Sequence, residues 1–225
     1  IMFAENNRPE GQQTMIHKFD LSGRSADYRA SGAVPGYMLS QWAMSEYDGY
    51  LRVASTDAPD WWDGPESESM VTVLDTNGDE LETVGTVDGL GRGERIYSVR
   101  FFGDTGYVVT FRQVDPLFAI DLSDPKSPKV LGKLKIPGFS DYMHPLGDDH
   151  LLTIGRDIDE ETQRDNGTAL QIFDVSDPVT PILAHKALVG EGYSEANHNH
   201  KAFNFYAAKG LLAFPFVSYE GDFSS

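Results

Sequence analysis

Four carboxylates stand within five residues of this chain, at Asp157, Asp159, Glu160 and Glu161. Such a cluster could bind a hard cation such as calcium, which takes about six to eight oxygen ligands in proteins. The segment lacks the glycine and the final glutamate of an EF-hand loop. Asp57 and Asp60 form a second, poorer candidate. We therefore predict a solvated charged loop and no cofactor, with weak calcium binding as the alternative.

Two histidines, His198 and His200, lie two positions apart at the expected start of a strand near 200–206. In extended backbone their side chains would share one face, a spacing that suits a transition metal or proton transfer. No third ligand can be assigned by spacing. If both histidines and a carboxylate met in one open pocket, catalysis would be favoured, whereas histidines facing the core would count against it.

Aromatic and cationic residues give two further candidate ligand sites. Adjacent Trp61 and Trp62, in the acidic segment DAPDWWDGPESES, could stack on a sugar ring or fill the gap between neighbouring sheets. Arg95, Arg112 and Arg156 could form a cationic patch that binds a carboxylate through the planar guanidinium group. The alternative for these arginines is pairing with Asp115, Asp141 or Asp157.

Three residues align in the first expected strand of successive repeats, namely Arg100, His144 and Asn204. Apolar neighbours such as Val99 and Met143 alternate with them. Because buried polar groups need hydrogen-bond partners, we expect a structural network here.

These residues are positioned by a repeated unit, seen most clearly between Arg95 and Gly138. Four apolar runs in that stretch, at 96–102, 107–111, 117–122 and 130–136, are separated by Gly, Asp and Pro turn signals. The motifs HKFDLSG, TVLDTNG, FAIDLSDP and QIFDVSDP place Asp20, Asp75, Asp121 and Asp174 in one frame, with spacings of 55, 46 and 53 residues. A second set, DGYLRVAS, TGYVVTFR, DHLLTIGR and KGLLAFPF, keeps the same frame. Periods near 40–50 residues are typical of four-stranded propeller blades.

The sequence thus predicts an all-β protein, a β-propeller of four-stranded antiparallel blades with about four blade units in the chain. We expect one domain over 1–225, with units at 37–88, 94–138 and 139–190 and a further unit formed by 1–36 together with 199–225. The two ends could complete one blade in a closed four-bladed ring, or the chain could be part of a larger propeller. A start in the middle of a strand, without an initiator methionine or signal peptide, favours the fragment.

Composition narrows the classes of partner. The net charge is -17, from 35 acidic and 18 basic residues, which disfavours nucleic acid and anionic membrane surfaces. Cysteine is absent, so disulfides and thiolate chemistry are excluded. No apolar stretch approaches the ~20 residues of a membrane span.

The stretches SEYDGYLRVAST, GERIYSVRFFGDTGYVVTFRQVDPLFAIDLSDPKSPKVLGKLKIPGFSDYMHP and HKAFNF resemble the secreted bacterial and archaeal family of C-terminal β-propeller domains distantly related to WD repeats. The resemblance covers most of 16–215. It implies an exported protein, secreted or at the cell surface, in a family of undefined biochemical role without established catalytic residues. The GH and WD dipeptides of WD repeats do not occur at matching positions.

The long connections are all expected on one face, where propellers commonly bind ligands. No GxSxG, HExxH or GxxxxGK[ST] motif occurs in the sequence. We therefore predict an exported, non-catalytic, acidic binding module for a protein or glycan partner on this long-loop face. The alternative is a hydrolase or lyase that uses Asp or Glu with His198 or His200 in the propeller funnel.

Overall fold

The computed structural model describes residues 12–57, 67–111, 115–136, 138–159, 161–162 and 164–219. Within these ranges the secondary structure consists of β-strands and four short 3-10 turns, with no α-helix. The prediction of an all-β fold is confirmed.

Three sheets contain a run of four strands in antiparallel order, as predicted from the repeats. One contains β3 (Met44–Tyr47), β4 (Tyr50–Asp57), β5 (Glu68–Asn77) and β6 (Glu80–Leu90). The next contains β7 (Arg95–Phe102), β8 (Thr105–Phe111), β9 (Asp115–Asp121) and β10 (Lys129–Ile136). The third contains β11 (Phe139–Leu146), β12 (His150–Ile158), β13 (Asp165–Asp174) and β14 (Ile182–Gly190). In each run, strands that are consecutive in the chain are neighbours in the sheet.

The two ends of the chain contribute smaller pieces. At the amino-terminal end, β1 (Gln13–Ser22) and β2 (Ser25–Pro35) form a hairpin that joins β6 through the single parallel pair Ser31 and Glu80. At the carboxyl-terminal end, β15 (Gly192–Tyr193) pairs with β18 (Val217–Ser218), and β16 (Asn204–Tyr206) pairs with β17 (Leu211–Ala213). The 3-10 turns are η1 (Gln41–Ala43), η2 (Glu195–Asn197), η3 (His200–Ala202) and η4 (Ala207–Lys209).

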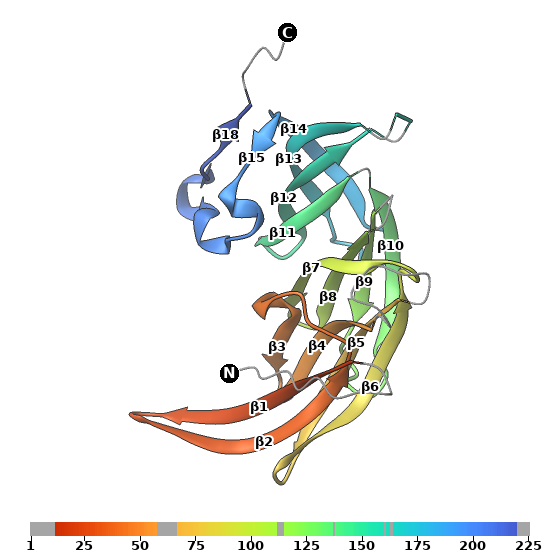
Figure 1. The fold of residues 1–225 in the computed structure, drawn as a ribbon, viewed down its shortest axis with the longest axis vertical. Coiled ribbons are helices and arrows are strands. Elements are labelled where there is room, and N and C mark those ends of the chain that lie inside the picture. Colours follow the sequence, from red (N-terminus) through yellow and green to blue (C-terminus); the bar gives the residue numbers. More distant parts are fainter. Residues whose placement is uncertain are drawn as a thin grey trace.

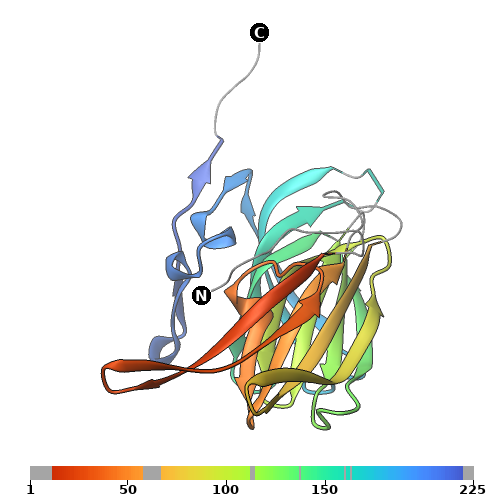
Figure 2. The same cartoon turned by 60° about the horizontal axis from the view of Figure 1, so that its bottom comes forward.

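The described strands form an open arc and not the closed four-bladed ring that was one alternative. Figure 1 shows β1 and β2 at one end of the arc and β15 and β18 at the other. No strand pairing connects these two ends among the described residues. The tip of the β1–β2 hairpin projects away from the other sheets in both views (Figures 1 and 2).

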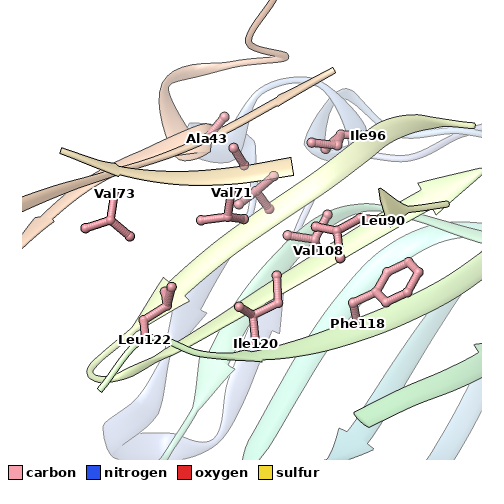
Figure 3. Close-up of a cluster of buried hydrophobic side chains, with 11 residues drawn as sticks. Ala43, Val71, Val73, Leu90, Ile96, Val108, Phe118, Ile120 and Leu122 are labelled. Carbon is pink, nitrogen blue, oxygen red and sulfur yellow. The ribbon is translucent and has the colours of Figure 1, made fainter. Parts of the chain in front are cut away.

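The hydrophobic core is divided into clusters that lie between neighbouring sheets. One cluster joins β3–β6 to β7–β10 and includes Val71, Val108 and Ile120 (Figure 3). Val109, the residue after Val108 in β8, belongs to the cluster between β7–β10 and β11–β14. Because successive side chains of a strand point to opposite faces, a strand between two sheets must be apolar on both. This accounts for the unbroken apolar runs of the second strands, such as TGYVVTF.

The repeated aspartates share one environment only in part. Asp121 and Asp174 end β9 and β13, and each accepts hydrogen bonds from the backbone N and the hydroxyl of the serine two residues later, at 2.9 and 2.6 Å for Asp121 and 3.0 and 2.6 Å for Asp174. Asp75 instead accepts from the backbone N of Thr76, and Asp20 pairs with Arg29. All four aspartates thus lie at or near the ends of their strands, and their partners differ because β1 and β5 continue for two more residues into tight hairpins.

Candidate functional site: a pocket lined by the inner elements

A pocket of about 600 Å³ is lined by the innermost elements of successive sheets. η1, β7, β11, η2 and η3 each contribute side chains from at or near their amino-terminal ends, although three strands separate β7 from β11 in the sequence. The lining residues are Leu39, Ser40, Gln41, Trp42, Tyr97, Asp141, Tyr142, Ala196, Asn197, His198 and His200. The connections between an outer strand and the next inner strand enter at these ends, so the pocket lies on the predicted long-loop face. We call it the axial pocket.

Short 3-10 turns position two walls of this pocket. The hydroxyl of Ser40 accepts from the backbone N of Trp42 at 3.3 Å and caps η1. The hydroxyl of Ser194 accepts from the backbone N of Ala196 at 3.1 Å and donates to the carbonyl of Pro215 at 2.6 Å. Serine is a favoured residue for such caps because its side chain satisfies a free backbone donor.

Asp141 supplies the carboxylate of the axial pocket. Its Oδ2 accepts a hydrogen bond from Nδ2 of Asn197 at 2.5 Å. Burial raises the pKa of Asp141 to about 6, against the opposing effects of Asn197, His198 and Arg156. A carboxyl group with this pKa can exist in either protonation state near neutral pH.

His198 and His200 also line the pocket, so both histidines and a carboxylate meet in one open site. Nε2 of Gln41 lies 3.2 Å from Nδ1 of His200, and the indole of Trp42 meets the His200 ring edge-on at 4.8 Å. An amide nitrogen only donates hydrogen bonds, so Nδ1 of His200 accepts and its Nε2 carries the proton. The two histidines are held by η2 and η3, and the expectation that they begin an extended strand is wrong because β16 starts only at Asn204.

A second layer of aromatic and cationic groups supports the pocket wall. The guanidinium of Arg100 lies 4.4 Å from the ring centre of Trp42, and the hydroxyl of Tyr142 lies 3.3 Å from Nδ1 of His144. Burial lowers the pKa of Arg100, and burial together with Arg100 lowers the pKa of His144. The expected network is therefore found only as the contact between Tyr142 and His144. Nη1 of Arg100 is buried without a hydrogen-bond partner among the described residues, and Asn204 is exposed and donates to the nearby carbonyl of Ala202.

Two of the predicted arginines, Arg95 and Arg156, lie beside the pocket and have partners. Arg95 donates from Nη2 to the hydroxyl of Tyr97 at 2.8 Å and lies over that ring. Arg156 pairs with Asp165 at 2.6 Å and donates to the carbonyl of Gly192 at 2.5 Å. The partner of Arg156 is therefore an aspartate that the sequence did not single out. Arg112, Trp61, Trp62 and Asp60 lie outside the described residues.

The three predicted calcium ligands that the structure describes, Asp157, Asp159 and Glu161, are not grouped around one point. Asp157 is 3% exposed and is bound by Nζ of Lys186 and by Nδ2 of Asn166. Oδ1 of Asp159 accepts from the backbone of Glu161 and from the backbone and hydroxyl of Thr162. Glu160 lies outside the described residues. Across the described ranges, no three His, Asp or Glu side chains are grouped to hold a metal ion.

Of the residues that line the axial pocket, only His198 and His200 were predicted as site residues. Sequence reasoning missed Asp141 and Asn197, and it also missed the side chains of Gln41, Trp42, Tyr97 and Tyr142. Asp141 was predicted only as a pairing partner for an arginine side chain. The register that aligns His144 with Arg100 also aligns Asp141 with Tyr97, and both line the pocket. This alignment was the available signal.

Repeated four-stranded sheets around a pocket of inner elements define a propeller-type protein. A family model described as a beta propeller domain matches residues 2–225, so the chain belongs to that family. An uncharacterized protein of Archaeoglobus fulgidus is 39% identical over 95% of this chain and 31% of its own length. An uncharacterized protein of Methanocaldococcus jannaschii is 40% identical over 89% of this chain and 30% of its own length.

The chain therefore spans about a third of the length of these relatives. None of the helical segments in the described ranges has the length and apolar character needed to cross a membrane.

Proposed function

We propose that this chain is a non-catalytic binding module whose protein or glycan partner contacts the long-loop face and inserts a group into the axial pocket. The supporting observation is that five inner elements bring aromatic rings and hydrogen-bonding side chains together around about 600 Å³. This volume lies in the range of roughly 300–1,000 Å³ that is usual for small-molecule sites.

A thermal-shift screen of oligosaccharides and peptides tests this function. A ligand of the folded state raises the unfolding midpoint as its concentration passes its Kd. We expect such a ligand to stabilise the wild type and the control Tyr206→Ala, whose side chain is 56% exposed on β16 outside the pocket. The variants Trp42→Ala and Gln41→Ala should lose the effect. Equal shifts in all variants, or no shift with any ligand, would contradict the proposal.

A second candidate function, a hydrolase or lyase, is favoured by the meeting of Asp141, His198 and His200 in one pocket. A pKa near 6 suits Asp141 to general acid or base catalysis. Glycoside hydrolysis commonly needs two carboxyl groups, and Asp141 is the only carboxyl group among the described lining residues.

Product formation distinguishes the two functions. For an enzyme, incubation with a panel of polysaccharides and peptides should give a product that Asp141→Asn fails to make. For a binding module, no product should form with a ligand that nevertheless stabilises the wild type.

The proposed location is outside the cell or at its surface. The support for this proposal is the resemblance of the sequence to an exported family. Fractionation of the source cells, followed by detection with an antibody against this domain, should find it in the medium or the surface fraction. Recovery with cytosolic markers would contradict the proposal.

A further inference from the structure

The polar groups of the axial pocket include both acceptors and donors. Asp141 receives one hydrogen bond, at Oδ2 from Asn197, and its Oδ1 has no partner among the described residues. His200 accepts at Nδ1 from Gln41, which leaves its Nε2–H as a donor. A ligand that fills this site must therefore both donate and accept hydrogen bonds.

Aromatic rings form the apolar part of the pocket. The rings of Trp42 and Tyr142 lie 6.2 Å apart at 58°, and Tyr97 packs on Phe139 at 5.3 Å. The guanidinium of Arg100 is held against Trp42, which fixes the indole in place. Rings held in this way offer flat apolar surfaces next to the polar groups.

The charges around the pocket are of mixed sign. Asp141 is acidic, whereas the basic side chains His198 and Arg156 are close enough to lower its pKa through their charge. A cationic ligand supplies only donors and a carboxylate only acceptors, so each would match half of the polar groups and meet a like charge nearby. A hydroxyl group both donates and accepts and carries no charge.

We propose that the axial pocket binds a neutral sugar residue of a glycan, with Asp141 and His200 on its hydroxyl groups and the ring of Trp42 or Tyr142 against its apolar face. This inference rests on the proposed function and names its ligand class. A sugar ring fits because its hydroxyls lie around its edge while its C–H groups form an apolar face.

The test is an array of neutral oligosaccharides, followed by titration of the sugars that bind to the 225-residue chain. Trp42→Ala and Asp141→Asn should each weaken binding about tenfold or more. Tyr206→Ala and the double variant Trp61→Ala/Trp62→Ala should bind as the wild type does. In the wild type, the imidazole NMR signals of His198 and His200 should shift on binding, while those of His17 and His185 stay in place. This last readout requires no variant to fold.

Three outcomes would overturn the sugar assignment. Sugar binding that Trp61→Ala/Trp62→Ala abolishes and Trp42→Ala leaves unchanged would show that Trp42 does not hold the sugar. If peptides bind through Trp42 and no neutral sugar binds, the axial pocket is a binding site but its ligand is not a sugar. Failure of every sugar and peptide would remove both the assignment and the proposed function.

Discussion

Two aspartates show how the environment of a single residue sets its effect on stability. Burial raises the pKa of Asp141 to about 6, whereas the hydroxyl and backbone N of Ser176 lower the pKa of the partly exposed Asp174. A raised pKa means that the folded state binds the proton more tightly than the unfolded chain. For Asp141 the favourable contribution is present below the ordinary pKa near 3.8 and is lost as pH rises to about 6. For Asp174, whose pKa is lowered, the favourable contribution is present above the ordinary pKa and is lost as pH falls.

Replacing Asp141 by asparagine should therefore stabilise the protein at pH values above 6. The shift from 3.8 to about 6 corresponds to a gain of roughly 2–3 kcal/mol, because the variant has no buried charge. The amide keeps an oxygen that can accept from Asn197. Urea unfolding at about pH 7.5 and near pH 4 measures the effect, which should shrink at the lower pH as the wild-type carboxyl becomes protonated.

Asp174→Asn is the matched control, since loss of the Asp174 carboxylate should slightly destabilise the protein at neutral pH. A destabilised Asp141→Asn at neutral pH would show that the carboxylate is held by favourable contacts. The pKa assigned to Asp141 would then be wrong.

The carboxylates at Asp157, Asp159 and Glu161 should give no saturable response to calcium. Asp157 is bound by Lys186, and one oxygen of Asp159 already accepts three hydrogen bonds within its own turn. A calcium ion would have to displace these partners. We expect calcium to change the unfolding midpoint no more than magnesium at equal ionic strength. A saturating rise that disappears in Asp157→Asn/Asp159→Asn would contradict this prediction.

At the scale of elements, glycines in the outer strands allow neighbouring sheets to approach closely. A Cβ on Gly85 of β6 would overlap the backbone oxygen of Pro125 in the turn after β9. A Cβ on Gly132 of β10 would overlap the carbonyl oxygens of Pro178 and Val179 in the turn after β13. The same kind of contact therefore joins two successive pairs of sheets.

Gly132→Ala should destabilise the protein by about 1–3 kcal/mol, the usual cost of overpacking. The reduced entropy of the unfolded chain offsets only about 0.4–1 kcal/mol. Chemical unfolding measures the change, and Lys135→Ala, an exposed position on the same strand, should be close to neutral. A neutral or stabilised Gly132→Ala would mean that the turn at Pro178 moves away at little cost.

Local sequence patterns predicted the sheets well because each strand and turn is specified within its own repeat. The runs at 96–102, 107–111, 117–122 and 130–136 correspond to β7, β8, β9 and β10 with small differences at their ends. The arrangement of the two ends was not specified in this way. It depends on how each sheet packs on its neighbour: the β1–β2 hairpin, for example, joins β6 through the single pair Ser31 and Glu80. A sequence motif within one repeat does not specify such packing.

At the scale of the whole molecule, the axial pocket shows why a site is harder to predict than a fold. Trp42, Tyr97, Asp141 and His200 come from four inner elements and meet only when the sheets are arranged around the arc. His198 and His200 were found from their close spacing, and Arg95 and Arg156 from their positions at strand ends. Asp141 has no neighbouring site residue in the sequence. The signal for it is the alignment of β7 with β11, which gives Asp141 and Tyr97 equivalent positions in successive repeats.

The net charge of -17 should make the stability of the whole molecule depend on salt. Raising ionic strength from about 10 mM to about 1 M shortens the Debye length from roughly 30 Å to about 3 Å. Repulsion among the excess carboxylates should then be screened, and the midpoint of thermal unfolding should rise by roughly 2–4 °C for each kcal/mol of repulsion removed. Neutralising the exposed Asp79, Glu80 and Asp88 as Asn, Gln and Asn should reduce this salt response while leaving the sheets intact. A midpoint that falls with salt would instead show that surface ion pairs, such as Arg29 with Asp20, outweigh the repulsion.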